Sequence, residues 1–193
     1  MKNIAIFASG AGSNAQKIID HFSDSTIARV TLILCNKPDA GIFRIAEKEN
    51  IPAILIEKDP FFRGDDYVQL LQREQIDLVV LAGFLWKVPA NLVQAFANRI
   101  INIHPALLPK YGGKGMYGHF VHEAVINAGD AESVITIHYV NEKYDDGATI
   151  LQERCTIVPG DTPETLAKKV QVLEHTWYPV IVERLLTNEA VSH

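Results

Sequence analysis

The segment Ile100–Pro105 is apolar except for two polar side chains that stand two residues apart, Asn102 and His104. In a strand, residues i and i+2 point to the same face, so Asn102 and His104 would present a carboxamide beside an imidazole. A neutral amide suits the stabilisation of a developing oxyanion, and an imidazole can also transfer protons. The pair therefore indicates acyl-transfer chemistry; the alternative is a structural histidine that is hydrogen-bonded at a strand end.

An acidic turn, Asp145–Gly147, offers the carboxylate that such a pair can use. It follows an expected strand, and its glycine would allow Asp145 to fold towards His104. A carboxylate beside an imidazolium favours the charged ring and can relay a proton through water. Asn102, His104 and Asp145 include no serine or cysteine nucleophile, which favours direct acyl transfer over a covalent intermediate. The spacing alone leaves a solvated turn aspartate as the alternative.

A second candidate site is the glycine-containing segment Ser9–Ala15, between an expected strand and an expected helix. Glycine lets backbone N–H groups approach an anion, the helix start adds partial positive charge, and Ser13 and Asn14 could add hydrogen bonds. This favours a phosphate monoester; the alternative is a tight turn in which Ser13 or Asn14 caps the helix. A dinucleotide is disfavoured because the second strand ends in Asn36 without an acidic residue, and no Walker A lysine follows.

The spacing of His119 and His122 would place them on one face of a short helix, because residues three apart are neighbours there. A zinc ion needs at least three protein ligands, and the sequence offers no third candidate nearby. We therefore expect no metal cofactor.

The elements that would hold these groups alternate strand with helix through the first half of the chain. The strand candidates are nearly continuous in Ile, Val, Leu and Ala, as buried parallel strands are: Asn3–Ala8, Arg29–Cys35, Ala53–Ile56, Leu78–Ala82 and Ile100–Ile103. The helix candidates between them are Asn14–Phe22, Phe43–Glu49, Asp65–Glu74 and Pro89–Ala97. This order predicts an α/β fold with a Rossmann-like, mostly parallel sheet and helices on both faces. Ligands of such sheets bind beyond the carboxyl ends of the strands, where Asn102 and His104 stand.

The second half is expected to add an antiparallel C-terminal extension of the sheet. After a glycine-rich loop at Tyr111–Gly118, one short helix and two strands are predicted at His119–Asn127, Ser133–Val140 and Ala148–Val158. Thr162, followed by a proline, is the predicted N-cap of a last helix that extends towards Leu186 and can bend at Pro179.

Composition limits the function classes. The 193 residues suit a single domain over 1–193, and 48% hydrophobic against 21% charged residues excludes disorder as the main state. A net charge of −5 without a basic cluster argues against a nucleic acid partner. Cys35 and Cys155 lie in or beside apolar runs, as buried thiols in a reducing compartment do. Without a signal peptide or a bilayer-length apolar stretch, we expect a cytoplasmic protein with small-molecule partners, no membrane partner, and a monomeric or homodimeric state.

Four segments together resemble the folate-dependent formyltransferases. They are Asn-Ile-His-Pro-Ala-Leu-Leu-Pro-Lys-Tyr at Asn102–Tyr111, together with Gly10–Asn14, Ala82–Leu85 and Leu173–Pro179. The resemblance covers essentially the whole chain and is strongest to members that act on glycinamide ribonucleotide in purine synthesis. It implies transfer of a formyl group from 10-formyltetrahydrofolate, a co-substrate, to the primary amine of that ribonucleotide, without a metal.

The resemblance also implies roles for single residues. Asn102, His104 and Asp145 match the catalytic trio: the first two, with His104 protonated, stabilise the tetrahedral oxyanion, and Asp145 sustains that protonation and assists proton transfer to the folate nitrogen. Gly12, Ser13 and Asn14 match the family's loop that holds the substrate phosphate. Glu174 matches a residue that contacts the ribose. The residues matching the pterin strip, largely through backbone groups, are Leu85, Trp86, Lys87 and Val88, and Asn102 also faces the folate.

Three positions depart from the pattern. Many members have an arginine near position 64 that meets the folate, whereas here position 64 is Gly and Arg63 precedes it. The loop Gly112–His119 is longer than in many members. Many members have Gly-Pro after the catalytic aspartate turn, whereas this chain reads Asp146–Ala148, Asp-Gly-Ala; a backbone shift there would misplace Asp145.

Other functions remain as alternatives at this point. Methionyl-tRNA formyltransferase shares the Asn-x-His-Pro chemistry but carries a C-terminal RNA-binding domain, for which this chain leaves no room. Formyltetrahydrofolate hydrolase has an additional N-terminal regulatory domain, whereas here the catalytic segment is expected to begin at residue 2. A dinucleotide-dependent oxidoreductase lacks its acidic ribose residue. A non-enzymatic nucleotide-binding module would leave Asn102, His104 and Asp145 without a purpose.

Overall fold

A single mixed sheet organises the fold in the computed structural model, which describes residues 1–188. Among these residues the strand order is β3-β2-β1-β4-β5-β6-β7. The strands are β1 (Lys2–Ala8), β2 (Ala28–Cys35), β3 (Ala53–Leu55), β4 (Leu78–Leu81), β5 (Ile100–His104), β6 (Glu132–Tyr139) and β7 (Thr149–Thr156). Strands β1 to β5 pair in parallel, whereas β6 and β7 pair antiparallel to their neighbours. The predicted α/β fold and its antiparallel extension are confirmed.

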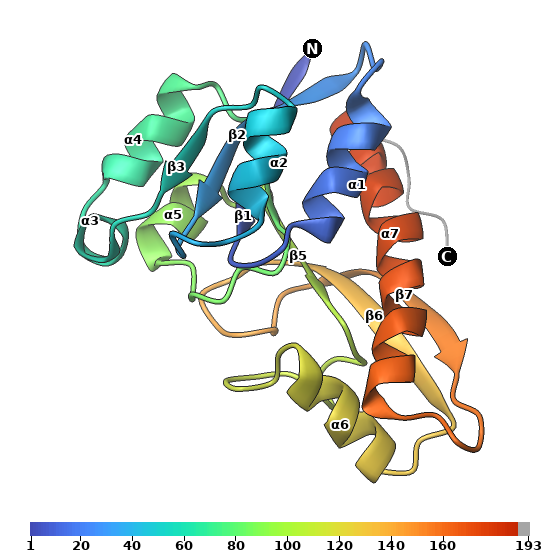
Figure 1. Ribbon diagram of the computed structural model, residues 1–193. Helices are drawn as coiled ribbons and strands as arrows, with labels where there is room; N and C mark the ends of the chain where they lie inside the picture. The colour runs from blue at the N-terminus through green and yellow to red at the C-terminus, as the bar shows by residue number, and fades with distance from the viewer. Residues whose placement is uncertain (189–193) are drawn as a thin grey trace.

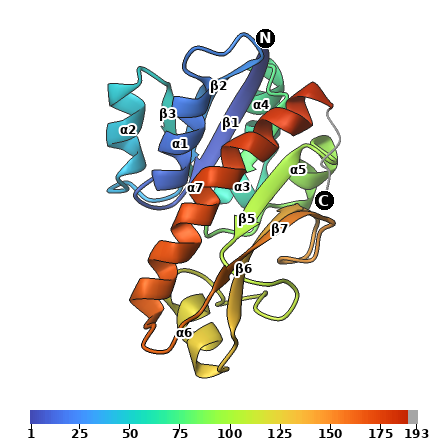
Figure 2. The same cartoon turned by 90° about the vertical axis from the view of Figure 1, so that its right-hand side faces the viewer.

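Helices cover both faces of this sheet, as predicted. They are α1 (Ser13–Phe22), α2 (Ile42–Lys48), α3 (Lys58–Arg63), α4 (Asp66–Arg73), α5 (Ala90–Ala95), α6 (His119–Asn127) and α7 (Pro163–Thr187). One apolar cluster joins the sheet to α1, α2, α6 and α7, and a second joins its other face to α3, α4 and α5. Helix α6 lies beside the N-terminal part of α7 in both views (Figures 1 and 2).

The local signals read from the sequence explain most of these boundaries. Thr162 accepts a hydrogen bond from the Thr165 backbone N–H and donates its own N–H to the Thr165 hydroxyl, so the predicted cap of α7 is present. The helix continues through Pro179 to Thr187. The sequence pattern missed α3, whose Pro60 stands in the first turn, where a missing N–H does no harm. No helix within residues 1–188 combines the length and the apolar character needed to cross a membrane.

Strand register sets the position of the candidate catalytic residues. In the β5–β6 pair, Asn102 lies opposite His138 and His104 lies opposite Thr136. The Thr136 hydroxyl donates to the Ala106 carbonyl over 2.8 Å and accepts from the Leu108 N–H, which fixes the chain as it leaves β5. The turn between β6 and β7 carries Asp145 back towards the carboxyl end of β5.

Candidate active site

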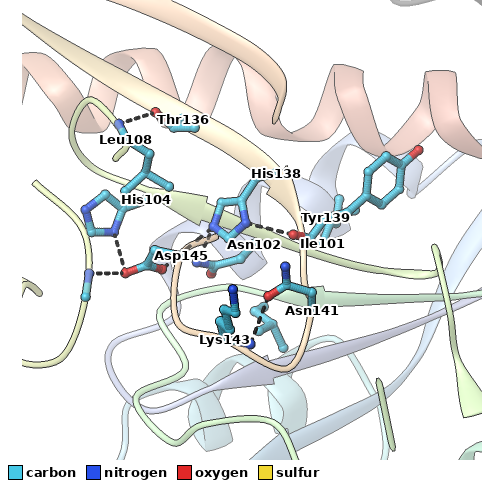
Figure 3. Close-up of polar contacts among 12 residues, drawn as sticks. Ile101, Asn102, His104, Leu108, Thr136, His138, Tyr139, Asn141, Lys143 and Asp145 are labelled. Carbon is cyan, nitrogen blue, oxygen red and sulfur yellow. Dashed lines mark hydrogen bonds and ion pairs between the residues drawn. The ribbon is translucent and has the colours of Figure 1, made fainter. Parts of the chain in front are cut away.

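His104 stands at the end of β5, is 3% exposed, and is held by the loop that follows it. Its Nε2 lies 2.7 Å from the Tyr111 carbonyl oxygen. Because a carbonyl only accepts hydrogen bonds, Nε2 carries a proton, and Nδ1 is the nitrogen left for chemistry. That Nδ1 faces the Asp145 carboxylate at 3.9 Å (Figure 3). The predicted approach of Asp145 to His104 is therefore present.

The Asp145 carboxylate touches three groups around it. The first is His104; the second is His138, whose Nε2 lies 3.8 Å from Asp145 Oδ1 (Figure 3). The third is the Gly113 backbone N–H, which donates to Asp145 Oδ2 over 3.0 Å. The residue has a φ of 49°, a left-handed conformation that aspartate tolerates better than most residues. The side chain is 14% exposed. A solvated turn aspartate, the alternative interpretation, does not fit this environment.

Asn102 is oriented by a residue that the sequence analysis missed, His138 on β6. His138 Nδ1 lies 2.9 Å from the Tyr139 carbonyl, so Nδ1 carries the proton and Nε2 is an acceptor. Asn102 Nδ2 donates to this Nε2 over 3.2 Å. One N–H of the Asn102 amide is therefore used for positioning, and the second remains to serve as a donor. The signal was available, since His138 follows Thr136 at i+2 in an apolar strand.

Burial decides the charge of both imidazoles. For His104 it lowers the pKa below the ordinary value, against the opposing effects of Asp145 and the Tyr111 carbonyl. For His138 burial also lowers the pKa, although the Tyr139 carbonyl and Asp145 oppose it. Both rings are therefore neutral near pH 7 in the free protein. The carboxylate does not outweigh desolvation in the free protein, and a protonated His104 at the stage of the tetrahedral oxyanion stays a prediction.

A cavity of about 1020 Å³ opens in front of these residues. Its wall includes Asn102, His104 and Asp145, and it reaches Asn14 and Glu174 on one side and Leu85 and Tyr144 on another. The loop 113–118 and the N-terminal part of α7 complete it. Pockets for drug-sized ligands span roughly 300–1,000 Å³, so this cavity has room for a ligand of more than one ring system.

The glycine-containing segment leads into α1 without a side-chain cap. Gly12 is the N-cap, with a φ of 82°, and Ser13 and Asn14 lie within the helix. The interpretation of Ser13 or Asn14 as the cap is therefore wrong. The first N–H groups of α1 have no side-chain acceptor at the cap, which is the arrangement that binds anions at helix starts.

Two contacts tie this helix start to α7. Asn14 Nδ2 donates to Glu174 Oε2 over 2.9 Å, and the Asn14 Oδ1 atom is buried without a partner. Burial raises the pKa of Glu174, although the Asn14 hydrogen bond opposes it. Gln171, which the sequence analysis missed, donates to the Ser13 hydroxyl over 3.3 Å and lines the cavity. It stands one turn before Glu174, a helical spacing that could have revealed it.

The residues assigned to the pterin strip separate in the structure. Leu85 lines the cavity, and its backbone N–H is already taken by the Ser9 hydroxyl at 2.9 Å. Trp86 packs in the second apolar cluster, where Val88 is also buried. Lys87 lies over the Tyr144 ring, with Nζ 5.8 Å from the centroid. Of these four residues, only Leu85 borders the cavity directly.

The three departures from the family pattern have different structural outcomes. Arg63 ends α3, is largely exposed, and lies 3.6 Å from Asp59 rather than in the cavity wall. The long loop reaches the cavity and is tied to the trio by the Tyr111 and Gly113 backbone. A Cβ at Gly147 would fall 1.7 Å from the Tyr139 carbonyl oxygen, so this glycine lets the turn pack closely on β6. The Asp-Gly-Ala sequence thus keeps Asp145 beside His104.

The polar side chains at the end of β5 resemble those of an acyl-transfer site more than the ligands of a metal site. Within residues 1–188, no group of three His, Cys, Asp or Glu side chains is arranged to hold a metal ion. His119 and His122 diverge: the former is half exposed, 3.9 Å from both Glu123 and Glu164, and the latter is buried. Around the end of β5, the cavity wall instead combines the His104 imidazole, the Asn102 amide and the Asp145 carboxylate.

A family model and individual relatives place the chain in the same family. The formyl transferase family matches residues 2–182. The chain is 35% identical to phosphoribosylglycinamide formyltransferase of Bacillus subtilis, over 96% of this chain and 95% of that protein. It is 43% identical to the chloroplastic phosphoribosylglycinamide formyltransferase of Arabidopsis thaliana over 94% of this chain, and it spans only 64% of that protein. For the chloroplastic relative from Vigna unguiculata the spanned share is 62%.

Solved structures agree with the fold. The crystal structure of phosphoribosylglycinamide formyltransferase from Bacillus halodurans superposes with a TM-score of 0.85 and 38% identity, covering 96% of each chain. The glycinamide ribonucleotide transformylase 1 from Geobacillus kaustophilus superposes with a TM-score of 0.86 and 35% identity, covering 96% of this chain and 99% of that one.

Proposed function

The chain belongs to the formyl transferase family, and we propose that it transfers a formyl group from 10-formyltetrahydrofolate to the primary amine of glycinamide ribonucleotide. The observation that carries this proposal is the shared cavity. Asn102, His104 and Asp145 line its centre, and the uncapped start of α1 and Glu174 stand to one side. An acyl-transfer trio beside an anion-binding helix start suits a phosphorylated amine as acceptor.

The cavity also suits the formyl donor. From the trio it extends past Phe84 and Leu85 to Tyr144, which is 45% exposed at the rim. An apolar and aromatic wall of this kind accepts a flat heteroaromatic ring and leaves a path for a charged tail to reach solvent. We assign the pterin to this side and the ribonucleotide to the side of Asn14 and Glu174.

The proposed reaction begins when the amine nitrogen of the ribonucleotide bonds to the formyl carbon, whose C=O electrons move onto oxygen. The free N–H of Asn102 stabilises this oxyanion. His104 is neutral beforehand, so its bare Nδ1 can take up the proton that the attacking amine releases. The imidazolium thus forms as the oxyanion develops, and the nearby Asp145 carboxylate stabilises it.

The tetrahedral intermediate then collapses as the C=O bond re-forms and the bond from the formyl carbon to the folate nitrogen breaks. The proton held at His104, relayed with the help of Asp145, passes to that nitrogen. The products are the formylated ribonucleotide amide and tetrahydrofolate, and His104 is neutral again. No covalent enzyme intermediate is needed, consistent with a trio that contains no serine or cysteine.

The test is a spectroscopic assay of the purified protein with a 10-formylfolate donor and glycinamide ribonucleotide. We expect turnover that requires both substrates and persists in a chelator. Donor cleavage at the same rate without the amine would identify a hydrolase instead. Loss of activity in chelator, restored by zinc, would overturn the metal-free mechanism. Saturable binding of NAD(P) without formyl transfer would support the dinucleotide alternative.

A further inference from the structure

Helix α6 carries a histidine that the proposed reaction leaves without a role. His122 is 6% exposed and lines the same cavity as His104. Its Nδ1 is buried and has no hydrogen-bond partner within the described part of the chain. Burying an imidazole nitrogen without a partner costs free energy, because its hydrogen bond to water is lost and not replaced. Because Nδ1 is buried, a ligand in the cavity that this ring lines can be met only by the other ring nitrogen, Nε2.

The environment of His122 determines what it can offer. Burial lowers its pKa, and the neighbouring His119 and His104 lower it further, so the ring is neutral near pH 7. A neutral imidazole has one N–H and one bare nitrogen. No acceptor meets the buried Nδ1, so a proton there would be unpaired, and we place the ring proton on Nε2. In this tautomer the ring can offer the cavity an uncharged N–H donor.

The position of His122 indicates which substrate meets this donor. Helix α6 lies beside the N-terminal part of α7, whose Gln171 and Glu174 line the cavity next to the start of α1 (Figures 1 and 2). The pterin side, at Leu85 and Tyr144, belongs to other elements. Building on the proposed function, we propose that His122 donates a hydrogen bond from Nε2 to a neutral oxygen of the ribonucleotide, between its phosphate and its amine.

Such a contact makes His122 a binding residue for one substrate only. It is made in the ground state and the transition state alike, so its loss should raise KM and leave kcat unchanged. In the free protein the ring gains no hydrogen bond from Nδ1, so replacing it with an apolar side chain of similar size should not lower stability. These two expectations separate a binding role from a structural one.

The experiment compares His122→Met with His122→Gln. Methionine fills the space but has no N–H, and we expect KM for glycinamide ribonucleotide to rise about tenfold, as loss of one hydrogen bond does. The donor KM and kcat should stay within about twofold, and Tm should not fall. The glutamine amide places an N–H near the position of Nε2 and should restore KM to within about threefold. Wild-type KM in the methionine variant, or a KM increase accompanied by a lower Tm in both variants, would overturn the assignment.

A matched control is His175→Met on α7. His175 also has a buried nitrogen without a partner, Nε2, but it does not line the cavity. Its substitution should leave the ribonucleotide KM unchanged, and an equal KM increase would show that the His122 effect is not local. Calorimetric titration of the wild-type protein with the ribonucleotide separates the two proposals. If the wild-type protein neither binds nor formylates the ribonucleotide, the proposed function fails; if it does both and His122→Met is unchanged, only this inference fails.

Discussion

The catalytic trio and the start of α1 border the same cavity but are built in opposite ways. At the trio, the proposed reactive groups are side chains, and a neighbour holds each of them by a hydrogen bond. The Tyr111 carbonyl holds His104, His138 holds Asn102, and the Gly113 N–H holds Asp145. At the start of α1, no side chain caps the helix, and the proposed donors to the ligand are backbone N–H groups. Under the proposed function, the first region would set the rate through proton position and the second would set the affinity for the phosphate.

The largest expected effect is at the trio. His104→Ala or Asn102→Ala should each reduce kcat by about 10²–10³, because each removes a group that stabilises the oxyanion or moves the proton. The ribonucleotide KM should change little, since the phosphate contacts remain. Steady-state kinetics and far-UV circular dichroism would measure this, with an unchanged fold as the control. Near-normal kcat in His104→Ala would show that the trio is not the site of chemistry.

Asp145→Asn should lower kcat by about 10²-fold or less and also move its pH dependence. Asp145 raises the pKa of His104 against the lowering effect of burial. Without the carboxylate, the His104 pKa falls further, so the ring stays neutral to lower pH. The acid limb of kcat should therefore shift to lower pH in the variant. A shift to higher pH, measured with buffers of constant ionic strength, would contradict the assigned contact.

His138 offers a smaller and sharper probe of the same region. His138→Phe removes the acceptor that orients the Asn102 amide, and we expect kcat to fall about tenfold with both KM values within about twofold. His138→Gln can supply an acceptor oxygen and should recover part of the loss. If His138 acts through Asn102 and not through its 3.8 Å contact with Asp145, the double variant with Asn102→Ala should be no slower than Asn102→Ala alone. Additive losses would indicate that His138 acts independently of Asn102.

The fold was largely predictable because its signals are local. Continuous apolar runs marked the strands, and the Thr162 cap marked the start of α7. Helix α3 escaped because six residues with a proline carry too little periodicity to be recognised. The antiparallel end was predicted from the turn residues, but its register was not, since register depends on which side chains pack across strands.

The candidate site was predictable where one strand carries two polar residues at i and i+2, as at Asn102 and His104. The contributions of His138 and Gln171 escaped because they depend on contacts between segments distant in sequence. The direction of the His104 pKa shift in the free protein could not be predicted for a similar reason: the opposing effects of burial and of Asp145 depend on the three-dimensional environment. Residue types predicted the chemistry, whereas tertiary packing determines protonation and orientation.

The smallest effect is expected at the start of α1, where Gly12→Ala should raise the ribonucleotide KM about fivefold to tenfold and leave kcat nearly unchanged. The structure places the cause of this effect in the packing of Gly12 on α2. A Cβ at Gly12 would lie 2.6 Å from Ile42 Cδ1 and 2.9 Å from Ile45 Cδ1, towards α2. The φ of 82° also disfavours alanine, so α1 must shift at its first turn, and its N–H groups move away from the phosphate.

Because the strain would lie between Gly12 and α2, an experiment can distinguish it from a methyl group that simply blocks the phosphate. Because the strain lies in the protein, Gly12→Ala should also lower Tm without ligand, which a methyl group that merely blocks the phosphate would not do. Gly10→Ala is the matched control: no atom lies within 4 Å of its added Cβ, so KM and Tm should stay near wild type. Inorganic phosphate should compete with the ribonucleotide but not with the folate donor. If Gly12→Ala weakens the donor and spares the ribonucleotide, the phosphate and pterin sides of the cavity are reversed.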